Sequence, residues 1–190
     1  NNAYTLKFQI TTPDYDLVQA KEAIFPVGRA DRIFYLNEEL RFRFTISNGG
    51  LTRAEAVKMT DFLEAQAGYE LKLVSTTGEN MNAGTVLNGH TMVARAVGCS
   101  QPAADKVSCT FTDKDYLGPK EQLDFELRFK LVDKSGTTNT ATTRVSFGDT
   151  AMVCSSGSQE EATTPNGYER KGWCTKAVHT DNNNNARING

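Results

Sequence analysis

The stretch that decides the fold is QLDFELRFKLV, residues 122–132. Its apolar residues alternate with its charged residues, in the order Leu123, Asp124, Phe125, Glu126, Leu127, Arg128, Phe129, Lys130 and Leu131. Successive side chains of a β-strand point to opposite faces, so this order predicts a strand with one buried face and one wet face. Such regular alternation is typical of antiparallel sheets.

The same alternation recurs along the chain. It is found in LRFRFTI (residues 40–46), which ends at the turn signal NGG (48–50), and in ATTRVSF (141–147). Seven or more short strands separated by turn signals predict an all-β chain, folded as an Ig-like antiparallel β-sandwich. Residues 51–68 are rich in helix formers but lack an apolar helical stripe, so we expect a strand near 54–60 and then a turn. A short helix after Asp61 is the alternative.

The first twelve residues, NNAYTLKFQITT, form the most regular amphipathic segment. Its apolar face consists of Tyr4, Leu6, Phe8 and Ile10. Two interpretations stay open: the segment is the first strand of its own sandwich, or it is donated to a neighbouring subunit, with TTPDYD (11–16) as the hinge. The start at Asn1 fits a mature chain from which a signal peptide has been removed.

Four cysteines form two sequence-local pairs, and no C-x-x-C motif occurs. Loop closure favours the local disulfides Cys99–Cys109 and Cys154–Cys174, and free thiols are the alternative. Disulfides imply an oxidising compartment, hence an extracellular or cell-surface protein. The second pair predicts a pinned hairpin, with a turn at Asn166-Gly167, followed by a polar tail that has no reason of its own to pack. We therefore divide the chain into an N-terminal strand (1–12), a sandwich (13–153) and a C-terminal hairpin and tail (154–190).

An ordered set of short motifs runs through roughly residues 32–149, at positions Asn48, Gly50, Thr60, Asp61, Leu63 and Cys109. In this pattern the middle of the chain resembles the DUF11-type repeat, an Ig-like module of prokaryotic surface proteins. The segment after Asp61 lacks the Leu-Pro of the family, and residues 88–106 are longer than expected. Members are generally structural parts of adhesins, surface coats and extracellular fibres, so the resemblance implies no catalytic residue.

Chemistry-bearing motifs are scarce. No nucleophile elbow, zinc-protease helix, P-loop or dinucleotide fingerprint occurs, and the histidines are His90 in a turn and His179 in the tail. We therefore expect no enzyme activity, no cofactor and no metal; Asp113, Asp115 and Asp181 are read as solvated turn residues. A net charge of −2 gives no basic field for nucleic acid, and no apolar run is long enough to span a membrane.

Tyr168 and Trp173 are the aromatic pair of the expected hairpin. They could stack on a sugar or a partner, but packing against the disulfide is the favoured interpretation. The sequence predicts an extracellular structural protein, a filament, pilus-like or surface-matrix subunit that forms a polymer of identical chains by β-strand donation. The alternative is a monomeric surface module for adhesion or for a carbohydrate or receptor ligand, for which the sequence gives no specific support.

Overall fold

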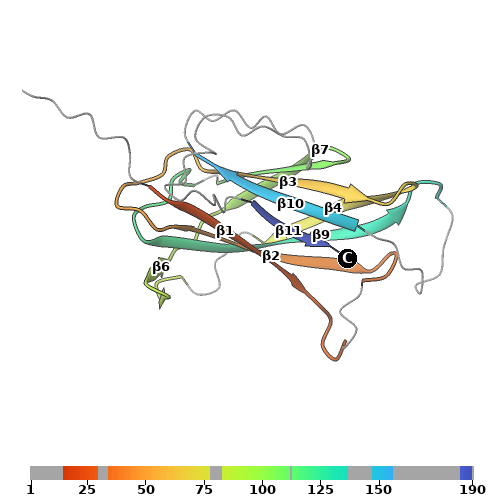
Figure 1. The fold of residues 1–190 in the computed structure, drawn as a ribbon, viewed down its shortest axis with the longest axis horizontal. Coiled ribbons are helices and arrows are strands. Elements are labelled where there is room, and N and C mark those ends of the chain that lie inside the picture. Colours follow the sequence, from red (N-terminus) through yellow and green to blue (C-terminus); the bar gives the residue numbers. More distant parts are fainter. Residues whose placement is uncertain are drawn as a thin grey trace, which may run out of the picture.

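The computed structural model describes residues 15–29, 34–77, 83–111, 113–136, 147–155 and 185–189. These residues form strands, turns and connecting segments, without a helix. The strands lie in two facing layers, with β1, β2 and β9 in one layer and β3 and β10 in the other (Figure 1). The predicted all-β sandwich is confirmed.

The first sheet is built around β9 (Glu121–Asp133). One side of β9 pairs antiparallel with β2 (Glu39–Asn48), which pairs in turn with β1 (Leu17–Ile24). Its other side pairs antiparallel with β4 (Tyr69–Thr77) and, at Glu121 and Gln122, parallel with β6 (His90–Met92), which continues to β5 (Val86–Leu87). The long alternating segment that decides the fold is therefore the central strand of its sheet.

The second sheet has the order β11 (Asn185–Asn189), β10 (Phe147–Cys154), β3 (Lys58–Ala65), β8 (Lys106–Phe111) and β7 (Val97–Ala103). All its pairs are antiparallel. The order β1-β2-β9-β4 facing β11-β10-β3 is the ABED and GFC arrangement of an immunoglobulin sandwich. The segment from β5 to β8 is an addition between the fourth and fifth of those strands.

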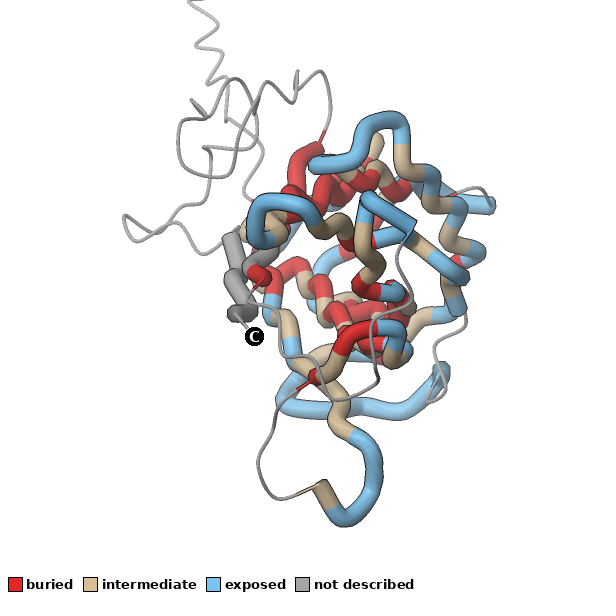
Figure 2. Tube along the Cα trace, turned by 90° about the vertical axis from the view of Figure 1, so that its right-hand side faces the viewer, coloured by how far each residue is buried: buried red, intermediate tan, exposed pale blue. Residues whose placement is uncertain are grey.

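The core lies between the sheets, where the buried residues gather (Figure 2). All five apolar residues that alternate in β9 are at most 2% exposed, and so are Leu40, Phe42, Phe44 and Ile46 of β2. Phe44 and Phe125 are cross-strand partners whose rings stack with centroids 5.2 Å apart. The alternation read from the sequence thus selects the correct inner face of both strands.

Two local expectations were wrong. The strand placed near residues 54–60 runs instead from Lys58 to Ala65, with Asp61 at its middle and no turn or helix there. This strand is buried on both faces, because Phe62 packs outward against Met152 and Cys154. The alternation that marks a half-buried strand is therefore missing.

The tail was also expected to have nothing to pair with, but Asn185–Asn189 adds to the edge of β10.

Candidate functional site

An ion pair between the two sheets is the most unusual feature of the interior. Lys21 lies on β1 and Asp61 on β3, and Lys21 Nζ donates a hydrogen bond of 2.8 Å to Asp61 Oδ1. Both side chains are 0% exposed. We call these two residues the inter-sheet pair.

The pairing of the strands explains how the two side chains meet. Lys21 is the cross-strand partner of Phe44, and its Nζ lies 4.8 Å from the centre of the Phe44 ring and 5.0 Å from that of Phe42. Asp61 lies on the central strand of the opposite sheet, where its backbone partners are Val107 and Ala151. The ammonium group is therefore held against aromatic faces in the core and directed toward the other sheet.

The electrostatics of this pair are governed by burial. Removal from water raises the pKa of the Asp61 carboxyl above its ordinary value, although the charge and hydrogen bond of Lys21 act in the opposite direction. Among the described residues, Asp61 Oδ2 has no hydrogen-bond partner. Chemically, the arrangement is a primary amine in contact with a carboxyl group in a site shielded from water.

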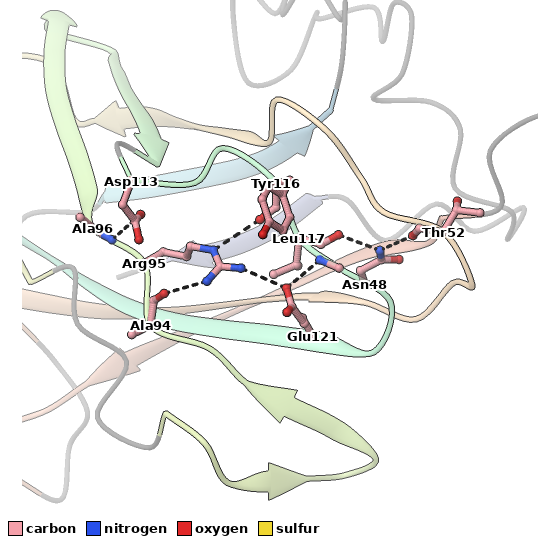
Figure 3. Close-up of polar contacts among 10 residues, drawn as sticks. Asn48, Thr52, Ala94, Arg95, Ala96, Asp113, Tyr116, Leu117 and Glu121 are labelled. Carbon is pink, nitrogen blue, oxygen red and sulfur yellow. Dashed lines mark hydrogen bonds and ion pairs between the residues drawn. The ribbon is translucent and has the colours of Figure 1, made fainter.

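A second polar cluster lies at one end of the sandwich (Figure 3). The guanidinium of Arg95 donates to the carbonyls of Ala94 and Tyr116 and pairs with Glu121 at 3.1 Å. Glu121 also accepts a hydrogen bond of 2.7 Å from the backbone N–H of Gly118. Arg95 is only 8% exposed, and its hydrogen bonds to Tyr116 and Glu121 fasten the loop before β9.

Asn48 lies at the same end of the sandwich (Figure 3), and one of its hydrogen bonds reaches the start of the described chain. Its amide donates to the carbonyls of Thr52 and Leu117, and its carbonyl accepts from the backbone N–H groups of Asp16 and Gly50. All four side-chain hydrogen-bonding positions are thus used by the protein itself. This end of the molecule is a structural junction rather than an open binding site.

Of the site residues predicted from sequence, the structure places one disulfide in full. Cys99 and Cys109 are cross-strand partners on β7 and β8 and form the expected bond. Cys154 ends β10 and is also disulfide-bonded, while its expected partner Cys174 lies outside the described residues. Six further residues lie outside them too: Tyr4, Leu6, Phe8, Ile10, Tyr168 and Trp173.

The inter-sheet pair was missed by the sequence analysis. Asp61 was noted only as a position in the DUF11-type motif, and Lys21 was not singled out. Either alternate set of residues in LVQAKEAI mixes apolar with polar side chains, so the inner face of β1 cannot be chosen from its sequence. The one indication of a buried charge in the sequence was Asp61, which lies between the large apolar residues of MTDFL (59–63).

Within the described ranges, no group of three or more His, Cys, Asp or Glu side chains is arranged to hold a metal ion. The same part of the chain contains no helix long and apolar enough to cross a membrane.

No family model and no curated protein matches the chain. Among solved structures, a CARDB domain from Pyrococcus furiosus, in complex with di-metal ions, is 13% identical with a TM-score of 0.43, covering 99% of this chain and 97% of that one. The full-length major pilin SpaD of Corynebacterium diphtheriae is 15% identical with a TM-score of 0.39, and covers 73% of this chain but 30% of its own.

A collagen-binding domain from a Staphylococcus aureus adhesin is 8% identical, with a TM-score of 0.32, and covers 95% of this chain and 98% of its own. Similarity at these levels does not extend to function, and the properties of these proteins are not transferred to this chain. The DUF11-type resemblance accordingly stays a prediction.

Proposed function

We propose that the chain is an extracellular structural protein, a subunit of a filament, pilus-like fibre or surface matrix, that assembles by donating residues 4–10 as a β-strand. The observation that carries this proposal is the position of β1. In the described part of the chain β1 pairs on one side only, with β2, and the amphipathic segment lies immediately before it in the sequence. A segment with a strand's alternation thus precedes a strand that, among the described strands, lies at the edge of its sheet.

The edges formed by β4 and β7 are less suited to accept a strand. On β4, the side chain of Gln101 accepts a hydrogen bond from the N–H of Leu73 and donates to the carbonyl of Leu71, both at 2.8 Å, so these edge groups are occupied. On β7, Pro102 lacks an N–H and falls where the register shifts. The side of the sandwich bounded by β1 and β11 is therefore the favoured place for strand addition.

The chain is firmly held just after the proposed hinge. Tyr15 is 5% exposed, the N–H of Asp16 donates to Asn48 Oδ1 at 3.0 Å, and the Asp16 carbonyl accepts from Gly49 N at 2.7 Å. A hinge that swings residues 4–10 toward another subunit must therefore lie within residues 11–14, which include Pro13. The donated strand would then leave from a fixed point on each subunit.

Burial of the four apolar side chains would be the driving force for donation. Tyr4, Leu6, Phe8 and Ile10 would each contribute on the order of 1.5–3 kcal/mol on burial, before the cost of ordering the strand is subtracted. Backbone hydrogen bonds to the accepting edge would fix the register. The extracellular assignment is supported by the Cys99–Cys109 disulfide, because such bonds persist in oxidising compartments. We further propose that the protein has no catalytic activity, since the sequence carries none of the common catalytic motifs.

The test is sedimentation, with electron microscopy of negatively stained samples, on four proteins: the intact chain, a deletion of residues 1–12, Phe8→Asp and Lys7→Asp. The intact chain should form filaments with a repeat near one domain length. The deletion and Phe8→Asp should remain soluble and monomeric, whereas Lys7→Asp, on the opposite face of the strand, should still assemble. A full-length monomer at high concentration, with residues 4–11 protected from hydrogen exchange, would establish the strand as part of its own domain and refute donation.

A further inference from the structure

We propose that Lys21 and Asp61 become covalently joined, by an amide bond between Lys21 Nζ and Asp61 Cγ that ties β1 to β3 across the core. Lys21 Nζ lies 2.8 Å from Asp61 Oδ1, and Cγ is one covalent bond beyond that oxygen. The two side chains come from strands 40 residues apart in sequence and from opposite sheets.

Burial favours the neutral forms of the amine and the carboxyl group, which the reaction needs. Both side chains are fully enclosed, so the separated charges of an ammonium and a carboxylate are costly at this place. A proton that moves along the hydrogen bond from Lys21 Nζ to Asp61 leaves a neutral amine and a neutral carboxylic acid. These are the reactants of amide formation, and burial by itself favours the protonated Asp61 carboxyl.

The step balances without any other reagent. The Nζ lone pair attacks Asp61 Cγ to give a tetrahedral intermediate, and a proton passes from Nζ to one of the carboxyl oxygens. That oxygen leaves as water, the C–O bond breaks, and the second oxygen remains as the amide carbonyl. No oxidant, nucleotide or metal takes part.

Fixed contact in the folded chain makes this step accessible. Holding two reacting groups together gives effective concentrations on the order of 10⁵–10⁸ M for well-oriented pairs. In water the ionisation of the two groups opposes condensation, whereas inside the core the neutral amide replaces two buried charges. The aromatic rings of Phe42 and Phe44, 5.0 and 4.8 Å from Nζ, restrict the amine to the side of Asp61.

Such a bond would make the domain more resistant to tension applied at its N-terminal segment. Among the described strands β1 lies at the edge of its sheet, and the N-terminal segment precedes it in the sequence. Tension applied to residues 1–14 would reach β1 first and strip its hydrogen bonds to β2. A covalent link from Lys21 to the central strand of the opposite sheet would stop that process at residue 21.

The first experiment is the intact mass of the full chain, measured after denaturation and complete reduction of the disulfides. We expect a mass lower than the sequence mass by one water molecule. Lys21→Arg and Asp61→Ala should each restore the full sequence mass. The matched control is Lys72→Arg, because Lys72 Nζ lies at the same 2.8 Å from Glu70 but in an exposed pair, and the loss of water should persist there.

The second experiment uses only the unaltered chain, so that it holds even if a core variant fails to fold. Trypsin does not cleave after an acylated lysine, so the digest should contain a branched peptide joining residues 8–29 to residues 59–72. An intact mass equal to the sequence mass, or separate peptides 8–21 and 59–72 without the branched product, would overturn the proposal. So would a loss of water that survives in Lys21→Arg, because a succinimide elsewhere in the chain gives the same mass. The mass is the same in monomers and filaments, so this result is independent of the test of assembly.

Discussion

Asn48, the last residue of β2, donates its side-chain amide to the carbonyl of Leu117, a residue 69 positions further along the chain. The same side chain binds the start of β1 through the N–H of Asp16 and the following turn through Gly50 and Thr52. One fully buried amide thereby connects three separate segments at one end of the sandwich.

Replacement of Asn48 should destabilise the fold strongly. Asn48→Ala removes the side-chain partner of the Asp16 and Gly50 N–H groups and of the Thr52 carbonyl, and one of the two donors to the Leu117 carbonyl. We expect a loss of about 2–4 kcal/mol in the free energy of unfolding. Asn48→Asp keeps the shape but directs a carboxylate oxygen at the carbonyls of Thr52 and Leu117, so it should be no better. Urea unfolding provides the measurement. Thr52→Ala is the control, because only the Thr52 backbone is used, and equal losses in both variants would refute the role of the amide.

Gly118 should tolerate no side chain while Glu121 is present. A Cβ at residue 118 would lie 3.0 Å from Glu121 Cδ, closer than normal van der Waals contact. Gly118→Ala should therefore cost on the order of 1–3 kcal/mol, the usual range for an overpacked site. In a Glu121→Ala background the added methyl has room, so its cost should fall clearly, and a double-mutant cycle measures the difference. An unchanged cost in that background would mean that the contact with Glu121 is not its source.

The sequence predicted those parts of the fold in which alternation and burial agree. β2 and β9 each have one inner and one outer face, so the pattern predicts which side chains are buried. Their pairing with each other and the stacked rings of Phe44 and Phe125 were not predicted and come from the structure. Even there, the outer face is not fully wet, because Glu126 is 6% exposed beneath its hydrogen bond from Arg41. The disulfide Cys99–Cys109 followed from loop length alone.

The predictions that were wrong or missing concern contacts between residues far apart in the sequence. β3 is covered on both faces, so no period of two marks it, and its apolar run conceals Asp61 as the partner of Lys21. That partnership depends on which strands face each other across the core, and local sequence does not contain this information. The pairing of β10 with β11 was missed for the same reason, since nothing in NARIN (185–189) identifies its neighbour.

Loss of the disulfide between β7 and β8 should have a measurable but limited effect. Cys99 and Cys109 enclose a short loop, with a sequence separation of 10, so the cross-link removes little entropy from the unfolded chain. We expect the double replacement Cys99→Ala and Cys109→Ala to lower the free energy of unfolding by about 2–3 kcal/mol without loss of the fold. Denaturant titration in the absence of reductant compares it with the unaltered chain. No difference between the two proteins would show that the bond does not form in solution.

The stability of a chain that lacks Lys21 should depend on pH through Asp61. Burial raises the pKa of this carboxyl above its ordinary value of 3.8, and the charge and hydrogen bond of Lys21 oppose that effect. In Lys21→Met both opposing influences are gone, so the pKa of Asp61 should rise further. A folded-state pKa above the unfolded value means that the folded chain binds the proton more tightly. This contribution to stability is complete below about pH 4 and is lost as pH rises through the folded-state pKa.

The measurement compares Lys21→Met with the double variant Lys21→Met/Asp61→Leu, because neither can form the proposed amide and the second carries no carboxyl at residue 61. Between about pH 4 and pH 8 the unfolding free energy of Lys21→Met should fall relative to the double variant, by at most about 1.4 kcal/mol per pH unit. The double variant should also be the more stable of the two at neutral pH, since a buried charge without its partner is worse than an apolar side chain of similar size. Parallel pH profiles for the two variants would show that Asp61 reaches water when Lys21 is absent, and that the carboxyl is held in the core only by its contact with the amine.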